Sequence, residues 1–115
     1  MLLLPSLAVA EKRFSSDGRG VTWDCNTDPN VAIEGNNGTF TLTGACKKIV
    51  VDGNQNNIHV DAADKVTING NENKVDAGTL GSLAVNGNTN TFKAKTHVTH
   101  VSSPGNNNTV DNPAR

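Results

Sequence analysis

Asp61 and Asp64 are the residues of this chain whose type and spacing come closest to acid–base chemistry. A pair of carboxylates can hydrolyse a glycosidic bond when the two flank that bond in a cleft and one of them has a raised pKa. Long loops build such a cleft in repeat proteins that cleave polysaccharides, whereas the segments between successive Gly-Asn motifs here differ in length by one residue. The favoured interpretation is a protein without catalytic activity, and an enzyme fragment that acts on glycans is the alternative.

The other chemistry-bearing side chains predict neither a metal site nor a nucleophile. His97 and His100 are three residues apart, so on a strand they point to opposite faces and form a weak ligand set. Serine, histidine and aspartate occur without a motif that would frame a nucleophile. Asparagines stand where glycine-rich calcium-binding repeats have aspartates, and a calcium cage needs carboxylates. We therefore expect no catalytic residue, no cofactor and no metal.

The composition indicates one small domain without a strong electrostatic field. The chain has 115 residues and a formal net charge of −1, so neither nucleic acid nor an anionic membrane is an expected partner. Asparagine and glycine are abundant, which is typical of turns or disorder but also of chains that stack as β-structure. The aromatic residues are few for a conventional globular core: Phe14, Trp23, Phe40 and Phe92.

The first ten residues are typical of the late part of a signal peptide. An apolar run ends in the triplet AVA, and charge begins at Glu11. A basic start is missing and the run is short, so residues 1–10 are interpreted as a truncated signal peptide, with a buried strand or helix turn as the alternative. The run is too short to span a bilayer. We expect a secreted, periplasmic or cell-envelope protein.

Two cysteines agree with export. Cys25 and Cys46 are predicted to form a disulfide in an oxidising compartment, and two buried free thiols are the alternative. In the register of the repeats they occupy successive units at nearly the same corner. A bond between them would close a loop of about 20 residues and fasten the irregular start of the fold to the regular stack.

A Gly-Asn-x-Asn-x-apolar motif repeats along the chain with a nearly constant period. Successive motif glycines are 18, 17, 17 and 18 residues apart: Gly35, Gly53, Gly70, Gly87 and Gly105. The first asparagine recurs as Asn36, Asn54, Asn71, Asn88 and Asn106, and the second as Asn56, Asn73, Asn90 and Asn108. A fixed period of this kind indicates a repeat architecture.

Apolar residues alternate on both sides of each motif and predict short strands. In most units they stand four and two residues before the glycine and five and seven residues after it. A unit this short cannot close a domain, but it can form one rung of a solenoid whose rungs lie about 4.8 Å apart. The predicted fold class is therefore all-β, a single-domain parallel β-solenoid of about five rungs of 17–18 residues. Parallel crossovers favour a right-handed coil, and the sequence leaves a left-handed solenoid open as the alternative. Residues 31–115 are assigned to the repeats and residues 11–30 to an N-terminal cap.

The motif residues have structural roles in such a fold. The turn glycines supply a backbone geometry at the corner that a Cβ atom would forbid. Asparagine tolerates left-handed backbone, and amides stacked on identical neighbours can bond from rung to rung. Both asparagine columns are therefore predicted to be structural ladders.

The pattern resembles the DUF3060 family of bacterial exported or envelope proteins with repeated Gly-x-x-Asn-x-Val units. The resemblance covers residues 23–110 and is carried by Cys25, the segment LTGAC that ends at Cys46, and the Gly-Asn motifs. It implies a β-solenoid of unknown biochemical activity, and it adds no catalytic residue.

A strip of small, uncharged residues is the predicted binding face. Three residues before the motif glycines stand Ala32, Val50, Thr67, Ala84 and Ser102, where the alternation predicts outward side chains. We expect an unknown protein or glycan of the cell exterior to bind there, and packing against the N-terminal segment is the alternative. Ice binding is a third hypothesis, because Thr39, Thr91 and Thr109 share an outward column, although Lys74 interrupts it. The sequence leaves the oligomeric state open.

Overall fold

The computed structural model describes residues 12–14, 20–96, 98–103 and 105–112. The predicted signal peptide, His97 and the last three residues lie outside this part of the chain. Within it all regular structure is β, and the strands pair in parallel in one continuous sheet. The strands are β1 Lys12–Phe14, β2 Val21–Asp24, β3 Asn30–Ile33, β4 Thr39–Val51, β5 Asn57–Ile68, β6 Lys74–Val85, β7 Thr91–Ala94, β8 His100–Ser102 and β9 Thr109–Asp111.

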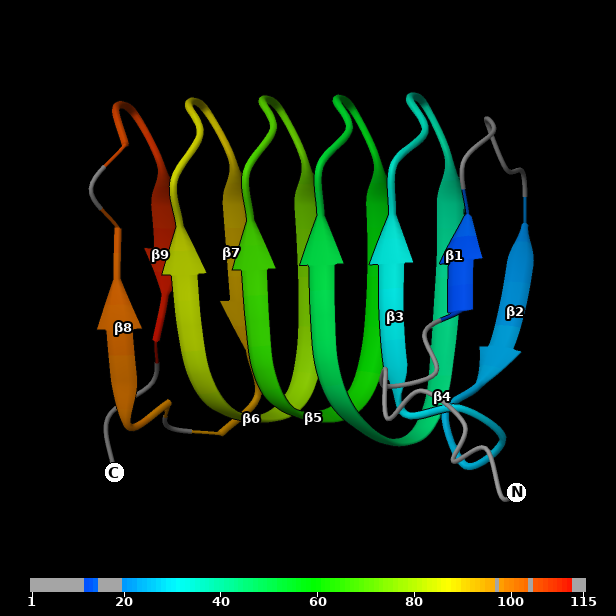
Figure 1. Ribbon diagram of the computed structural model, residues 1–115. Helices are drawn as coiled ribbons and strands as arrows, with labels where there is room; N and C mark the ends of the chain where they lie inside the picture. The colour runs from blue at the N-terminus through cyan, green and yellow to red at the C-terminus, as the bar shows by residue number, and fades with distance from the viewer. Residues whose placement is uncertain (1–11, 15–19, 97, 104, 113–115) are drawn as a thin grey trace, which may run out of the picture.

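The sheet is wound into a right-handed coil with two faces (Figure 1). The chain rises through the strands nearer the viewer, crosses at a Gly-Asn corner, and descends through the farther strands while it advances along the coil axis. We call the nearer side the front face, which holds β1, β3, β8 and the second halves of β4, β5 and β6. The back face holds β2, β7, β9 and the first halves of β4 to β6. The predicted parallel β-solenoid is thus the observed fold, and its coil has the hand that parallel crossovers favour.

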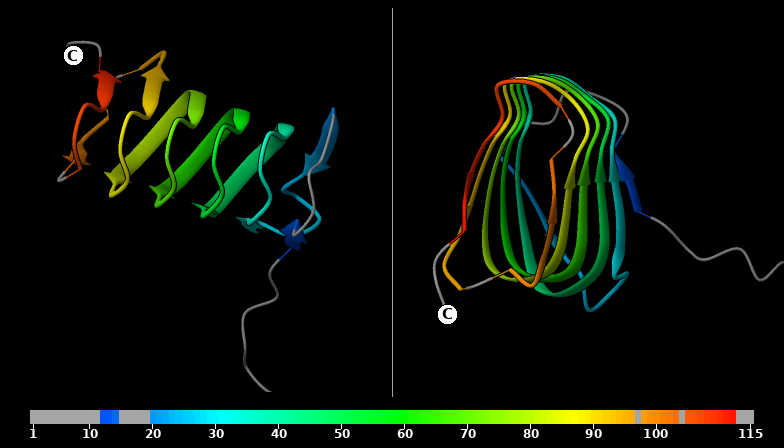
Figure 2. Two further views of the ribbon diagram at one scale, coloured as in Figure 1. Left: turned by 90° about the horizontal axis from the view of Figure 1, so that it is seen from above. Right: turned by 90° about the vertical axis from the view of Figure 1, so that its left-hand side faces the viewer.

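The long strands β4, β5 and β6 run through the corner opposite the Gly-Asn turns without a loop (Figure 2). The alternation had predicted short strands separated there by a corner or a short third side. A further core column explains the continuity, because Cys46, Ala63, Leu80 and Val98 turn inward at this corner and are buried. The extra residue of the first 18-residue unit is also absorbed there, as a register shift between Leu42 and Ala45.

Identical motif positions stack in register along the whole coil. Phe40 pairs with Ile58, Ile58 with Val75, Val75 with Phe92, and Phe92 with Val110. Such side chains are removed from water and fill the interior between the two faces, where each apolar residue lies against its counterparts in the neighbouring rungs. The core is therefore a bundle of columns that needs few aromatic residues.

Aromatic side chains close the N-terminal end of the coil. β1 and β2 pair in register with β3 and β4, so the described part of the predicted cap extends the same sheet. The Phe14 ring lies 6.2 Å from the Trp23 ring and 5.4 Å from the Phe40 ring, centroid to centroid. The Lys12 ammonium group lies over the Phe14 and Trp23 rings, a cation–π arrangement.

The last rung is less covered than the ones before it. Val101 belongs by sequence to a core column, yet 39% of it is exposed. Val110 is only half-buried, because no further described rung lies beyond it. Asn112 closes the corner of this rung, since its side chain accepts from the Val98 amide at 2.8 Å and donates to the Val98 carbonyl at 3.2 Å.

A disulfide joins the first two rungs at the corner opposite the Gly-Asn turns. Cys25 and Cys46 are bonded and are both buried. The bond confirms the predicted pairing, and it ties the segment after β2 to the middle of β4. A search of the described residues for a helix long and apolar enough to cross a membrane finds none.

Candidate functional site

The second asparagine of each motif points inward and binds the rung before it. Asn56, Asn73 and Asn90 are each only 1% exposed. The Asn73 amide group donates to the Gly53 carbonyl at 2.9 Å, and its Oδ1 accepts from the Asn56 backbone amide at 3.0 Å. Asn56, Asn90 and Asn108 repeat this pattern on their own preceding rungs. These amides satisfy backbone groups that the turn would otherwise bury without partners.

The first asparagine of each motif is exposed and bonds in the opposite direction. Asn54 Oδ1 accepts from the Asn71 backbone amide at 2.9 Å, and Asn71 Oδ1 accepts from the Asn88 backbone amide at 3.0 Å. The same bond joins Asn36 to Asn54 and Asn88 to Asn106. The two columns together link each corner to both of its neighbours.

Four of the five motif glycines, from Gly53 onward, are required by close approach of the backbone. A Cβ atom on Gly70 would lie 1.6 Å from the Gly53 carbonyl oxygen, and Gly53 and Gly87 are in the same position relative to the rung before. The left-handed backbone lies two residues later, at Asn37, Gln55, Glu72, Thr89 and Asn107, with φ of 57–58°. Sequence reasoning placed left-handed conformation in the asparagine columns and missed this position, whose residue types vary.

A third polar column lies just before the glycines, and the motif did not reveal it. The Asn69 amide donates to Asp52 Oδ1 at 2.7 Å, and the Asn86 amide donates to Asn69 Oδ1 at 2.9 Å. All three side chains are exposed, so they border the front face along its Gly-Asn edge.

The predicted strip lies on the front face and borders a groove. Ala32 is buried at 4% exposure, so the accessible strip consists of Val50, Thr67, Ala84 and Ser102. The groove has a volume of about 470 Å³ and is lined mainly by residues of the paired strands β6 and β8. It is lined by Lys65, Ser82, Leu83, Ala84, Thr99, His100, Val101 and Ser102. The sequence could not show the groove, because it depends on the shortness of β8 and the exposure of Val101.

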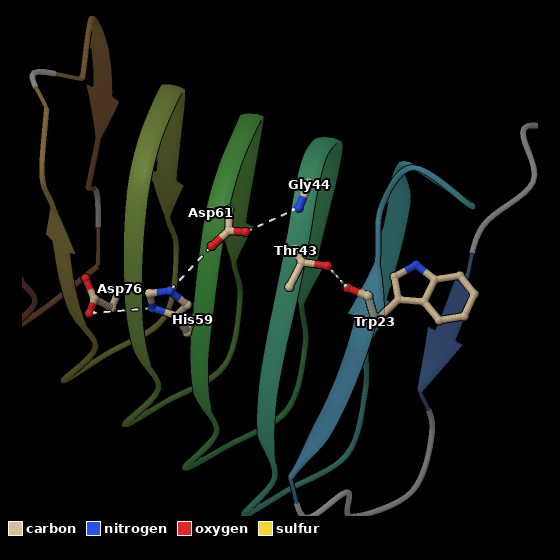
Figure 3. Close-up of polar contacts among 6 residues, drawn as sticks. All are labelled: Trp23, Thr43, Gly44, His59, Asp61 and Asp76. Carbon is tan, nitrogen blue, oxygen red and sulfur yellow. Dashed lines mark hydrogen bonds and ion pairs between the residues drawn. The ribbon is translucent and has the colours of Figure 1, made fainter.

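The back face carries a small polar cluster around His59 (Figure 3). His59 Nδ1 lies 3.8 Å from Asp76 Oδ2 on the neighbouring rung, and His59 Nε2 lies 3.6 Å from Asp61 Oδ1. The other Asp61 oxygen accepts from the Gly44 amide at 3.3 Å. All three side chains are about half exposed and lie on an open strand surface, so the cluster links rungs without enclosing a substrate.

The carboxylates that sequence chemistry singled out do not form a pair over a cleft. Asp61 bonds to His59 and Gly44 on the back face, and Asp64 is exposed beside the corner that leads to the front face. Neither side chain lines the groove. In the part of the chain that the structure describes, no group of three or more histidines, cysteines, aspartates and glutamates could hold a metal ion.

Parallel rungs, stacked motif glycines and two oppositely bonded asparagine ladders define a β-solenoid repeat protein. Residues 33–82 match the model of the family DUF3060, which is described as a protein of unknown function. The match confirms the family resemblance and spans the disulfide cysteine Cys46 and the first three Gly-Asn motifs. No curated protein and no solved structure is detectably similar to the chain.

Proposed function

We propose that this chain is a non-catalytic binding module of the cell exterior and that the accessible strip on the front face is its binding surface. The observation that carries the proposal is the groove, which Ala84 and Ser102 of the strip line directly. Small side chains leave an even surface there, and hydroxyl groups of Ser82, Thr99 and Ser102 offer hydrogen bonds to a ligand.

The disulfide supports a location outside the cytoplasm. Cytoplasmic reductants keep thiols reduced, whereas an oxidising compartment preserves a bond such as that between Cys25 and Cys46. An envelope or secreted module would meet glycans and other exported proteins, which are the two ligand classes expected from the sequence.

Binding of the purified protein to an immobilised panel of bacterial envelope glycans and exported proteins tests the proposal. Replacing Thr67 and Ala84 together by glutamine should abolish binding, because two long side chains would fill the strip. Replacing Thr91 and Thr109 by glutamine makes the same change at exposed positions of the back face and should leave binding unchanged. Binding that survives the first pair of changes would show that the strip is not the site.

The two alternative functions predict different measurements. Turnover of a glycan by the purified protein that disappears in Asp61→Asn or Asp64→Asn would make the chain an enzyme. Ice binding would give thermal hysteresis, and we expect none because Lys74 stands exposed between Asn57 and Thr91 in the threonine column.

A further inference from the structure

Two exposed lysines lie side by side at the border of the strip. Lys48 on β4 and Lys65 on β5 are register partners, and the same column continues as Ser82 and His100. Like charges directly opposite on neighbouring strands repel each other and destabilise the sheet. Neither lysine forms an ion pair among the described residues. The row thus holds two adjacent lysines that no carboxylate of the described residues neutralises by an ion pair.

The charges around the groove favour an anionic ligand. Lys65 and His100 line the groove, and no carboxylate does. Asp64 precedes Lys65 at the corner, and the backbone carbonyl of Asp64 lies against Gly81. On the rung before, the exposed Lys47 stands at the position that corresponds to Asp64. The acids Glu34 and Asp52 border the opposite edge of the front face, and neither side chain lines the groove.

The groove also limits how a ligand could be held. No phenylalanine, tyrosine or tryptophan ring lines it, on which the apolar face of a neutral sugar could stack. Its polar groups are one ammonium, one imidazole and several hydroxyls, which suit carboxylate and hydroxyl oxygens together. A sugar acid presents both kinds of oxygen on one ring.

The row also sets the direction of a bound polymer. Rungs place successive side chains of the row about 4.8 Å apart, and Ser82 stands between Lys65 and His100. A polymer that reaches all three side chains lies along the coil axis, and the hydroxyl groups of the groove favour a polysaccharide over a peptide.

We propose that the groove and the row of Lys48, Lys65 and His100 bind an acidic polysaccharide that lies along the coil axis. This inference rests on the proposed binding function and adds the chemical class of the ligand. The carboxylates of the polymer lie beside Lys48, Lys65 and His100, and its hydroxyls bond to Ser82, Thr99 and Ser102. The bound polymer also relieves the repulsion between the two lysines.

Polygalacturonate and its fully methyl-esterified form are the probes, because they share one backbone and differ in charge. The full chain should bind polygalacturonate, lose binding as salt rises, and bind the ester much more weakly. Replacing Lys48 and Lys65 together by glutamine should raise the dissociation constant by on the order of tenfold. The matched control is Lys93→Gln with Lys95→Gln, which removes the same charge from exposed positions away from the groove and should change little.

Several outcomes would overturn the inference. Equal binding of the ester, or an unchanged dissociation constant in the Lys48 and Lys65 variant, would exclude recognition of charge. Binding of polyglutamate as tight as that of polygalacturonate would show that an acidic protein fits equally well. If a neutral glycan binds instead and the Thr67 and Ala84 glutamine variant abolishes that binding, the ligand class is wrong while the proposed binding function stands. If no panel member binds, both fail.

Discussion

At the scale of single residues, the two asparagine columns stabilise the Gly-Asn corners in different ways. The inner column supplies hydrogen-bond partners for backbone groups that are buried away from water. The outer column adds hydrogen bonds at exposed positions, where water could take their place. Two residues of the same type, two positions apart, therefore contribute differently to stability.

Replacing Asn73 by alanine should lower the free energy of unfolding by about 2–4 kcal/mol, because buried groups of Gly53 and Asn56 lose their partners. The same change at Asn71, which is exposed, should cost less than about 1 kcal/mol. Urea unfolding followed by circular dichroism measures both. Equal losses would contradict the distinction between the columns.

Gly70→Ala should prevent folding, or lower the free energy of unfolding by several times the amount by which Glu72→Gly raises it. The new Cβ atom would overlap the Gly53 carbonyl, which the buried Asn73 amide group holds in place by a hydrogen bond. Glu72 has a φ of 57°, so glycine there should relieve strain of about 1 kcal/mol, less the entropy that glycine adds to the unfolded chain. Thermal unfolding of the two variants compares them, and a soluble, stable Gly70→Ala protein would refute the role of close approach.

At the scale of elements, the strands are predictable from alternation, but their lengths are not. Apolar residues at every second position fix which side chains of β5 point inward. The same pattern could not show that β4 to β6 continue round the second corner, because Ala63 and Leu80 reach the interior only when the neighbouring rung is in place. The left-handed position was hidden for a related reason, since its side chain varies and only its backbone is constant.

The disulfide fastens the first strand pair to the regular rungs, so its removal should loosen the N-terminal end. Replacing Cys25 and Cys46 by serine should cost about 3 kcal/mol, as expected for a cross-link over 21 residues. Hydrogen exchange should rise first in β2 and the start of β4, which pair with each other. Uniform loss of protection along the coil would contradict a local role. Unchanged mass after alkylation without reduction checks that the wild-type thiols are bonded.

At the scale of the whole molecule, the fold is a stack whose units contact only their neighbours. β5 bonds to β4 and β6, and its side chains have no described partner farther along the coil. Only part of the candidate site could be predicted from the sequence. The alternation predicts the outward strip, whereas the groove is found only at β6 and the short strand β8 of the last rung.

Removing residues 70–86, one complete 17-residue rung, should leave a folded and shorter protein. Asn69 would then precede Gly87, and every column would stay in register. Stability should fall because one core layer is lost, while the β-sheet circular dichroism spectrum and cooperative unfolding should persist. Removing residues 70–78 instead breaks the period and should abolish folding. A folded second variant would show that register does not control assembly.

The alignment of interstrand hydrogen bonds with the coil axis has a mechanical consequence. Tension applied between the two ends of the coil would load the bonds of one rung interface at a time, and the least covered rung, with β8 and β9, would peel first (Figure 1). Each detached 17-residue rung would release roughly 50–60 Å of chain. The molecule would lengthen in steps of similar length. At the N-terminal end, the disulfide between Cys25 and Cys46 would keep the chain between these two residues from extending.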